Sequence, residues 1–172
     1  MNHAQRAMAM RAAQAASRGR RIALSPLLVA ANGAIRLTPA ELRHITGPMT
    51  DAVRAFRRAA GTYADWLRLC TARNVGQAIE DGGVVRGLQE ILDEAHTVLL
   101  HISWRMETPA GWRPGALHAP EIRAIANLAE KHTFQLRQLS YSEYQTAYRL
   151  AASRVLSDGG ECVNLKQQEK QG

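Results

Sequence analysis

Cysteine is almost absent from this chain: Cys70 and Cys162 are its two cysteines in 172 residues. Two are too few for a disulfide-stapled scaffold or for a zinc module built on several cysteines. No apolar run approaches the roughly 18 residues of a membrane-spanning helix, so we expect no membrane association. Lysine is also scarce, with 3 lysines against 19 arginines. GC-rich codon usage explains this bias more simply than a selected preference for bidentate phosphate contacts.

Acidic residues are missing from the beginning of the chain, where the first one is Glu41. Before it stand six arginines: Arg6, Arg11, Arg18, Arg20, Arg21 and Arg36. From Leu37 onward 16 basic residues face 15 acidic ones, so the net charge of +7 comes almost entirely from the first 36 residues. We therefore predict that residues 1–36 form a basic, disordered arm able to contact DNA or RNA phosphates.

The same region has the outline of an export signal. Arg20 and Arg21 precede an apolar stretch, residues 22–31, as in a twin-arginine or secretory signal. Pro26 interrupts that stretch, and about twenty residues precede the arginine pair. We therefore favour a cytoplasmic protein with free thiols.

Helix signals dominate after the arm. Capping patterns at Thr38, Thr62 and Ser140, and a proline at position 120, each predict the start of a helix. The pair Gly47 and Pro48 predicts a break that separates a first short helix from a second one over 49–60. No segment has a strand pattern. The sequence therefore predicts an all-α bundle of about five helices over residues 37–158, followed by a polar tail, residues 159–172.

The clearest predicted helix is Val85–Met106, whose apolar residues recur at three- and four-residue spacing. This apolar seam needs a helical partner. The partner can lie within the chain or in a second subunit, and the pattern does not decide between them. A homo-oligomer or a complex with another protein through this helix is therefore one hypothesis.

Enzyme signatures are missing. His96 and His101 are about 140° apart around a helix rather than on one face, and no HExxH or paired-cysteine pattern is present. The sequence has no nucleophile elbow and no phosphate-binding glycine loop. We interpret Cys70 as a buried thiol and His132, on the apolar stripe of its helix, as a hydrogen-bonded core residue. We therefore predict no catalytic residue, no metal site and no cofactor.

Three features remain as candidate contact sites. Trp112 and Arg113 occupy a loop between two helices and suit a partner-binding patch, although Trp112 folding back over the bundle end is the favoured alternative. Tyrosines at 141, 144 and 148 share one face of the last helix, where we favour a core or partly core position. Arg54, Arg57 and Arg58 can contact phosphates, and a solvated helix face explains them equally well. A helix-turn-helix is not indicated, because Gly82 and Gly83 interrupt the position of the recognition helix.

Several segments carry a resemblance: the arginine-rich start with the residues Arg-Ile-Ala-Leu-Ser-Pro-Leu at 21–27, the run Gly-Pro-Met-Thr-Asp-Ala-Val-Arg-Ala-Phe at 47–56, and a long helix ending near Gly-Trp-Arg at 111–113. Over about residues 20–155 the chain resembles a loose group of small helical proteins from proteobacterial phages, plasmids and integrated elements. Some of that group are labelled Fis-like regulators. The resemblance implies an origin in a mobile element and no catalytic residues.

Two hypotheses follow. In the first, the protein is a non-enzymatic accessory or regulatory protein of a mobile element that contacts nucleic acid through its arm. In the second, it is a protein-interaction module without nucleic-acid binding. An enzyme is the least favoured class.

Overall fold

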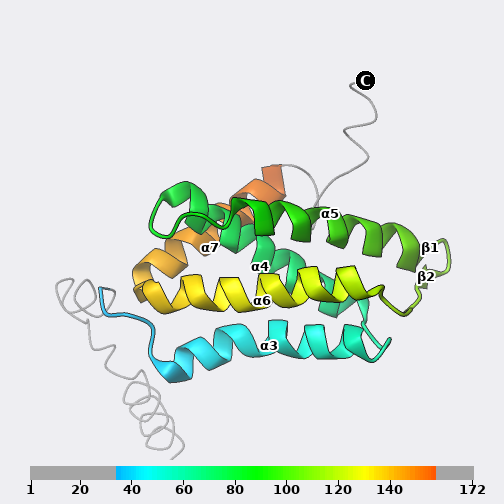
Figure 1. Ribbon diagram of the computed structural model, residues 1–172. Coiled ribbons are helices and arrows are strands. Elements are labelled where there is room, and N and C mark those ends of the chain that lie inside the picture. Colours follow the sequence, from blue (N-terminus) through cyan, green and yellow to red (C-terminus); the bar gives the residue numbers. More distant parts are fainter. Residues whose placement is uncertain (1–33, 158–172) are drawn as a thin grey trace, which may run out of the picture. The chain divides into compact units, whose positions relative to one another are not determined.

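The computed structural model describes residues 34–157. Within that range it contains five helices and one hairpin of two short strands, each two residues long. In chain order these are α3 (Pro39–Arg57), α4 (Tyr63–Gly82), α5 (Gln89–Met106), β1 (Glu107–Thr108), β2 (Gly111–Trp112), α6 (Ala119–Gln138) and α7 (Tyr141–Ser157). The prediction of an all-α bundle is confirmed (Figure 1). Residues 1–33 and 158–172 lie outside the described range, and with them most of the predicted arm and the polar tail.

The predicted capping signals are confirmed at three helix starts. The Thr38 hydroxyl accepts from the Glu41 backbone N–H at 3.3 Å, and the Glu41 carboxylate accepts from the Thr38 N–H at 2.8 Å. Thr62 with Asp65, and Ser140 with Glu143, form the same reciprocal pairs. Each box satisfies backbone donors that have no partner within the helix.

The predicted break at Gly47 and Pro48 is wrong, because α3 runs through both residues. A proline inside a helix costs about 3 kcal/mol. The residues after it, Met49, Ala52, Val53 and Phe56, are all buried on one face. Burying such side chains contributes more free energy than the proline costs, so tertiary packing keeps the helix continuous.

The helix predicted over Val85–Met106 begins only at Gln89. The chain before it turns through Gly83 and Gly87, both with positive φ. The Glu80 carboxylate of α4 then accepts from the backbone N–H groups of Gly87 at 2.7 Å and Leu88 at 3.1 Å. The cap of α5 is therefore supplied by another helix rather than by its own N-cap residue, which makes no side-chain cap bond.

The expectation of no strand is wrong by one short hairpin, in which Glu107 pairs with Trp112 and Thr108 with Gly111. The hairpin turns Trp112 back onto the bundle, where its indole N–H donates to the Gly61 carbonyl at 2.9 Å. Its ring lies 5.5 Å from the Tyr63 ring and 6.0 Å from the Trp66 ring, centroid to centroid. The favoured alternative, in which Trp112 covers the bundle end, is confirmed.

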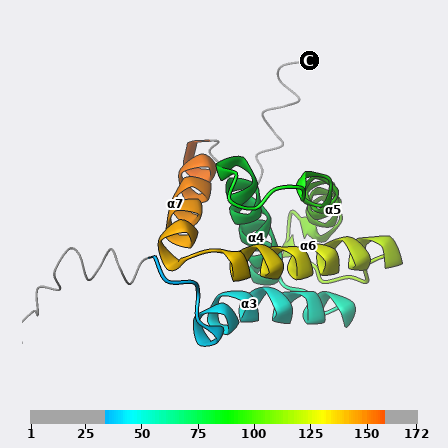
Figure 2. The ribbon, with the colours of Figure 1, turned by 60° about the vertical axis from the view of Figure 1, so that its left-hand side comes forward.

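Helix α4 is the centre of the bundle and packs against all four other helices. Helices α3 and α6 lie side by side, whereas α7 stands steeply to both (Figures 1 and 2). The apolar seam of α5 faces this interior, with Leu92, Ala95, Leu99, Ile102 and Met106 all buried. The seam partner lies within the chain, so this face of α5 is not available to a second subunit.

None of the helices in residues 34–157 has both the length and the apolar composition that crossing a bilayer requires.

Candidate partner-binding groove

Helix α7 is held by a narrower contact than the other helices. It buries only Ala147 and Ala151, and α4 is the one helix against which it packs extensively. At its N-terminal end the Tyr141 N–H donates to the Ile35 carbonyl at 3.2 Å. Further along, Arg154 forms an ion pair with Asp81 of α4 at 2.5 Å. Alanines bring the two helix backbones close together, so the larger side chains of α7 lie on its flanks.

The tyrosine face is an apolar flank of α7, and the predicted core or partly core position holds for Tyr144 but not for Tyr141 and Tyr148. Tyr144 is half-buried, but Tyr141 is 43% and Tyr148 is 46% exposed. Ala152 and Val155 continue the same flank, so its members recur at spacings of three and four residues. Such spacing is the pattern by which one helix face receives another. We call this set the tyrosine stripe: Tyr141, Tyr144, Tyr148, Ala152 and Val155.

Three adjoining hollows follow the tyrosine stripe, and we call them together the α7 groove. The first, of about 550 Å³, lies between α3 and the start of α7. The second, of about 280 Å³, shares Ile45 and Tyr144 with the first and opens between α3, α4 and α7. The third, also about 280 Å³, shares Val75 and Tyr148 with the second and extends along α4 and α7 to Leu156. Neighbouring hollows share wall residues, so the three hollows adjoin one another along α7.

His132 of α6 lines the middle hollow. It is buried, as the sequence predicted, and its Nδ1 lies 3.2 Å from the Gln135 side-chain oxygen. Burial lowers the pKa of His132 from the ordinary 6.5 to about 4, against a smaller opposing effect of the Gln135 hydrogen bond. The imidazole is therefore neutral at neutral pH.

The Tyr144 hydroxyl in the groove is also neutral. Burial, followed by the neighbouring Tyr148 and Tyr141, raises the pKa of Tyr144. The Tyr144 and Tyr148 rings lie 6.2 Å apart in a tilted arrangement, and the Tyr141 hydroxyl accepts from the Gln145 amide at 3.1 Å. The groove thus offers aromatic surface with polar tips, and the charged side chains of Glu41 and Arg68 also line it.

The arginines predicted to bind nucleic acid lie in separate parts of the chain. Arg6, Arg11, Arg18, Arg20 and Arg21 lie outside the described residues. Arg36 is exposed beside Ser140, at the other end of α3 from Arg57 and Arg58. A helix the length of α3 separates them by roughly 28 Å. Arg57 and Arg58 therefore do not form one patch with Arg36.

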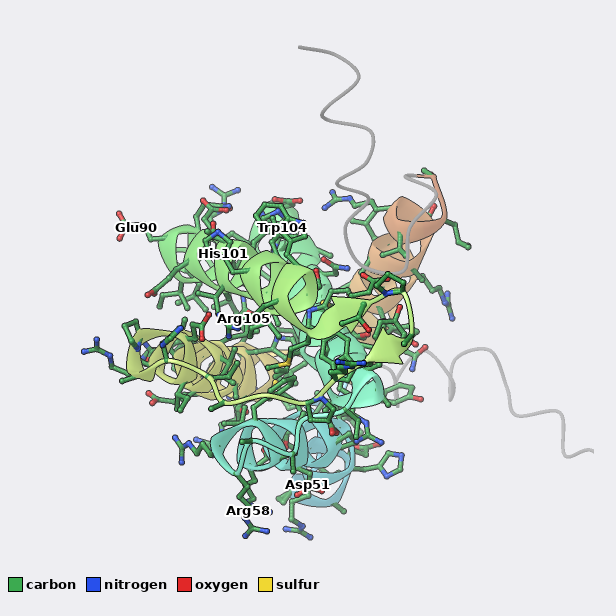
Figure 3. All side chains as sticks on the ribbon, turned by 90° about the vertical axis from the view of Figure 1, so that its right-hand side faces the viewer. Asp51, Arg58, Glu90, His101, Trp104 and Arg105 are labelled. Atoms are coloured by element: carbon green, nitrogen blue, oxygen red, sulfur yellow. The ribbon has the colours of Figure 1, made fainter. Side chains whose placement is uncertain are left out.

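The arginines on α3 are solvated. Arg54 pairs with Asp51 at 2.8 Å, and both side chains are more than 60% exposed. Arg57 and Arg58 are also exposed. Figure 3 shows Arg58 and Asp51 on the side of α3 that faces away from the other helices. Exposed pairs of this kind contribute little to stability.

The two residues predicted to bind a partner have different surroundings. Trp112 is half-buried and bonded to Gly61, so most of its indole is already engaged. Arg113 is exposed and holds the hairpin through its backbone N–H, which donates to the Met106 carbonyl at 2.8 Å.

Sequence reasoning missed two exposed features. The walls of the α7 groove contributed by α3 and α4, such as Ile45 and Thr71, have no sequence signal, because they depend on which helices meet. The second feature is Trp104, which is 62% exposed and lies on the outer side of α5 beside His101 (Figure 3). Its position on the polar face of α5 was readable from the helical periodicity.

Among residues 34–157 no group of three or more His, Cys, Asp or Glu side chains could hold a metal ion.

Comparison with known proteins gives no relative: no family model, curated protein or solved structure matches this chain significantly.

Proposed function

We propose that the protein works in the cytoplasm as a protein-interaction module that holds a helix of a partner protein in the α7 groove. The observation that carries this proposal is the tyrosine stripe, an apolar helix face on which Tyr141 and Tyr148 are exposed and against which, in the described residues, only α4 packs extensively. The groove walls, from α3 and α4, are built mainly of apolar side chains. The stripe is therefore half of a helix–helix contact.

The length of the α7 groove suits a single partner helix. From Tyr141 to Leu156 the groove follows about 22 Å of α7, which corresponds to about four helical turns of a partner. A partner segment of about 15 residues with apolar residues at positions i, i+3, i+4 and i+7 matches the spacing of the stripe. Tyrosine is a common energetic anchor of interfaces, because it buries a large rigid surface at low conformational cost.

The test is a selection of helical peptides that bind the α7 groove. A displayed library of 16-residue helical peptides, randomised on one face, is selected for binding to the full-length protein. A parallel selection uses the Tyr148→Glu variant, and the enrichment of each peptide is compared between the two proteins. We expect enriched peptides to have an apolar i, i+3/i+4, i+7 face and to perturb the NMR signals of α7 and α4. Enrichment that is equal on the wild-type protein and on Tyr148→Glu would contradict the proposal.

We propose a second candidate function, contact with DNA or RNA phosphates by the arm of an accessory protein from a mobile element. The observation that favours it is the charge distribution, with six arginines and no acid before Glu41. Replacing Arg18, Arg20 and Arg21 by Gln in the full chain should weaken DNA binding at about 50 mM salt and reduce its salt dependence. Binding that keeps its strength and its salt dependence would remove this function.

A further inference from the structure

We propose that the helix held in the α7 groove is α7 of a second copy of this chain, lying antiparallel to the first with Tyr148 at the two-fold axis. This inference rests on the proposed function, because it names the partner that the groove receives. The spacing, the sizes and the charges of the side chains along the tyrosine stripe support it.

The tyrosine stripe has a spacing that is symmetric about Tyr148. From Tyr141 to Val155 its members follow one another after three, four, four and three residues. In an antiparallel pair centred on Tyr148, Tyr141 therefore faces the partner's Val155, and Tyr144 faces the partner's Ala152. A two-fold dimer makes each of its contacts twice, once from each copy. A spacing that is the same in both directions along the helix meets this requirement.

The sizes of the side chains change along the stripe in the same sense. The large rings of Tyr141 and Tyr144 lie in its first half, whereas the smaller Ala152 and Val155 lie in its second half. The antiparallel pair sets each large side chain against a smaller one. A parallel pair would set tyrosine against tyrosine at one end and alanine against alanine at the other, which crowds the first contact and leaves a void in the second.

Tyr148 occupies the centre of this contact and meets the partner's Tyr148. Its side chain is 46% exposed, so much of the ring is available to be covered. Two such rings bury apolar surface and keep their hydroxyl groups at the edge of the contact. The charged residues of α7 are Glu143, Arg149 and Arg154, and each lies about 100° or more from Tyr148 around the helix. The centre of the contact therefore buries no charge from α7.

Charge complementarity favours the antiparallel direction. A two-fold axis between antiparallel helices brings the same edge of both together, so the partner's Arg149 lies beside Gln145. Gln145 lines the first hollow together with Glu41 of α3. Hydrogen bonds from Thr38 lower the pKa of Glu41, which is therefore ionised at neutral pH. Arg149 is exposed and takes part in none of the ion pairs within residues 34–157. A charge pair at this rim adds little affinity but disfavours other directions.

Sedimentation of the full-length protein measures whether this dimer forms. A contact one helix long is at the small end of stable interfaces, so we expect a concentration-dependent equilibrium between monomer and dimer. Tyr148→Glu places two carboxylates against each other and should weaken the association at least about hundredfold. Leu150→Glu, on the opposite flank of α7, should leave it within about twofold. A wild-type chain that stays monomeric, or equal weakening by both variants, would overturn the proposal.

Disulfide cross-linking tests the register and does not depend on the folding of Tyr148→Glu. The full chain carries Cys162→Ser, and Cys70 is buried. Tyr148→Cys should form a disulfide-linked dimer, because its two copies face each other and a disulfide needs Cα atoms within about 7 Å. Tyr141→Cys or Val155→Cys alone should not, because the two copies of either position lie about 21 Å apart along the helix axis. An equal mixture of the two should cross-link.

Two cross-linking results would contradict the antiparallel pair. The first is a Tyr148→Cys protein that forms no disulfide-linked dimer. The second is a Tyr141→Cys protein that cross-links alone as well as it does in the mixture with Val155→Cys, because this result indicates a parallel pair or random collision.

Peptides distinguish this inference from the proposed function. Peptides selected on the α7 groove should compete with the second copy and convert the dimer into monomers. Peptides that depend on Tyr148, found together with a chain that is itself monomeric, would overturn the second copy as the partner and leave the proposed function intact. A monomeric chain together with peptides that do not depend on Tyr148 would overturn both.

Discussion

Acidification should destabilise this protein well above the pH at which its carboxylates are protonated, because His132 is buried in its neutral form. Unfolding returns His132 to its ordinary pKa of 6.5, whereas in the folded protein its pKa is about 4. The unfolded state therefore binds a proton that the folded state excludes. The contribution to stability is fully present above pH 6.5 and is lost as the pH falls from 6.5 to 4.

The magnitude follows from these two pKa values. Over the whole range the loss is about 3 kcal/mol, and between pH 7 and pH 5 it is about 2 kcal/mol. His96 adds to the same effect, since burial, and then Arg73, lower its pKa. The carboxyl groups of Asp81 and Glu121 have lowered pKa values, so their contributions are lost only at more acidic pH.

Urea unfolding followed by circular dichroism at pH 7, 6 and 5 measures this loss. We expect the free energy of unfolding of the wild-type protein to fall about 2 kcal/mol more between pH 7 and pH 5 than that of His132→Phe. The exposed His101 provides the matched control, and His101→Phe should behave as the wild type does. If the wild-type protein and His132→Phe lose the same free energy within about 0.5 kcal/mol, the burial of a neutral His132 is refuted.

Three further substitutions test the packing and the caps, each by urea unfolding at pH 7. Leu99→Ala should cost about 2–5 kcal/mol, because Leu99 is only 2% exposed in the α5 seam, and a loss below about 0.5 kcal/mol would contradict its burial. Trp112→Phe should cost about 1 kcal/mol through the lost hydrogen bond to Gly61, and an unchanged stability would mean that this bond does not hold the hairpin in place. Ser140→Ala should cost about 1 kcal/mol through the lost cap of α7, which an unchanged unfolding midpoint would disprove.

Features that depend on nearby residues could be predicted from the sequence. The boxes at Thr38, Thr62 and Ser140 each need two side chains three residues apart, and all three are present in the structure. The burial of His132 and Cys70 followed from their places on apolar helix faces. These predictions succeeded because the interactions, or the periodicity behind them, lie within a single helix.

Features that depend on contacts between helices could not be predicted. The helix continues through Pro48 because its next turns are buried, and α5 begins at Gln89 because Glu80 of another helix caps it. The tyrosine spacing showed that Tyr141 and Tyr148 share a face, but periodicity does not say whether another helix covers that face. The hydrogen bond that the buried Gln135 amide donates to the Gly76 carbonyl joins residues that lie 59 positions apart in the sequence.

The α7 groove itself shows the same limit. Its walls come from α3, α4, α6 and α7, and their residues are ordinary core and surface types. Only the packing of α7 on α4 through Ala147 and Ala151 leaves the tyrosine stripe on a flank. A stripe that reads as core in the sequence is therefore a binding surface in our account.

The central claim is that a partner helix binds the tyrosine flank of α7, and a pair of matched variants tests it most directly. Tyr148 and Leu150 lie two residues apart on α7 and have similar exposed fractions, 46% and 40%. They line hollows on opposite flanks of the helix. The measurement is the dissociation constant of a groove-selected peptide for the full-length wild type, Tyr148→Glu and Leu150→Glu. We expect Tyr148→Glu to weaken binding by about thirtyfold, as for the loss of a 2 kcal/mol anchor, and Leu150→Glu to leave it within about twofold. Equal weakening by both variants, or loss only with Leu150→Glu, would contradict the account.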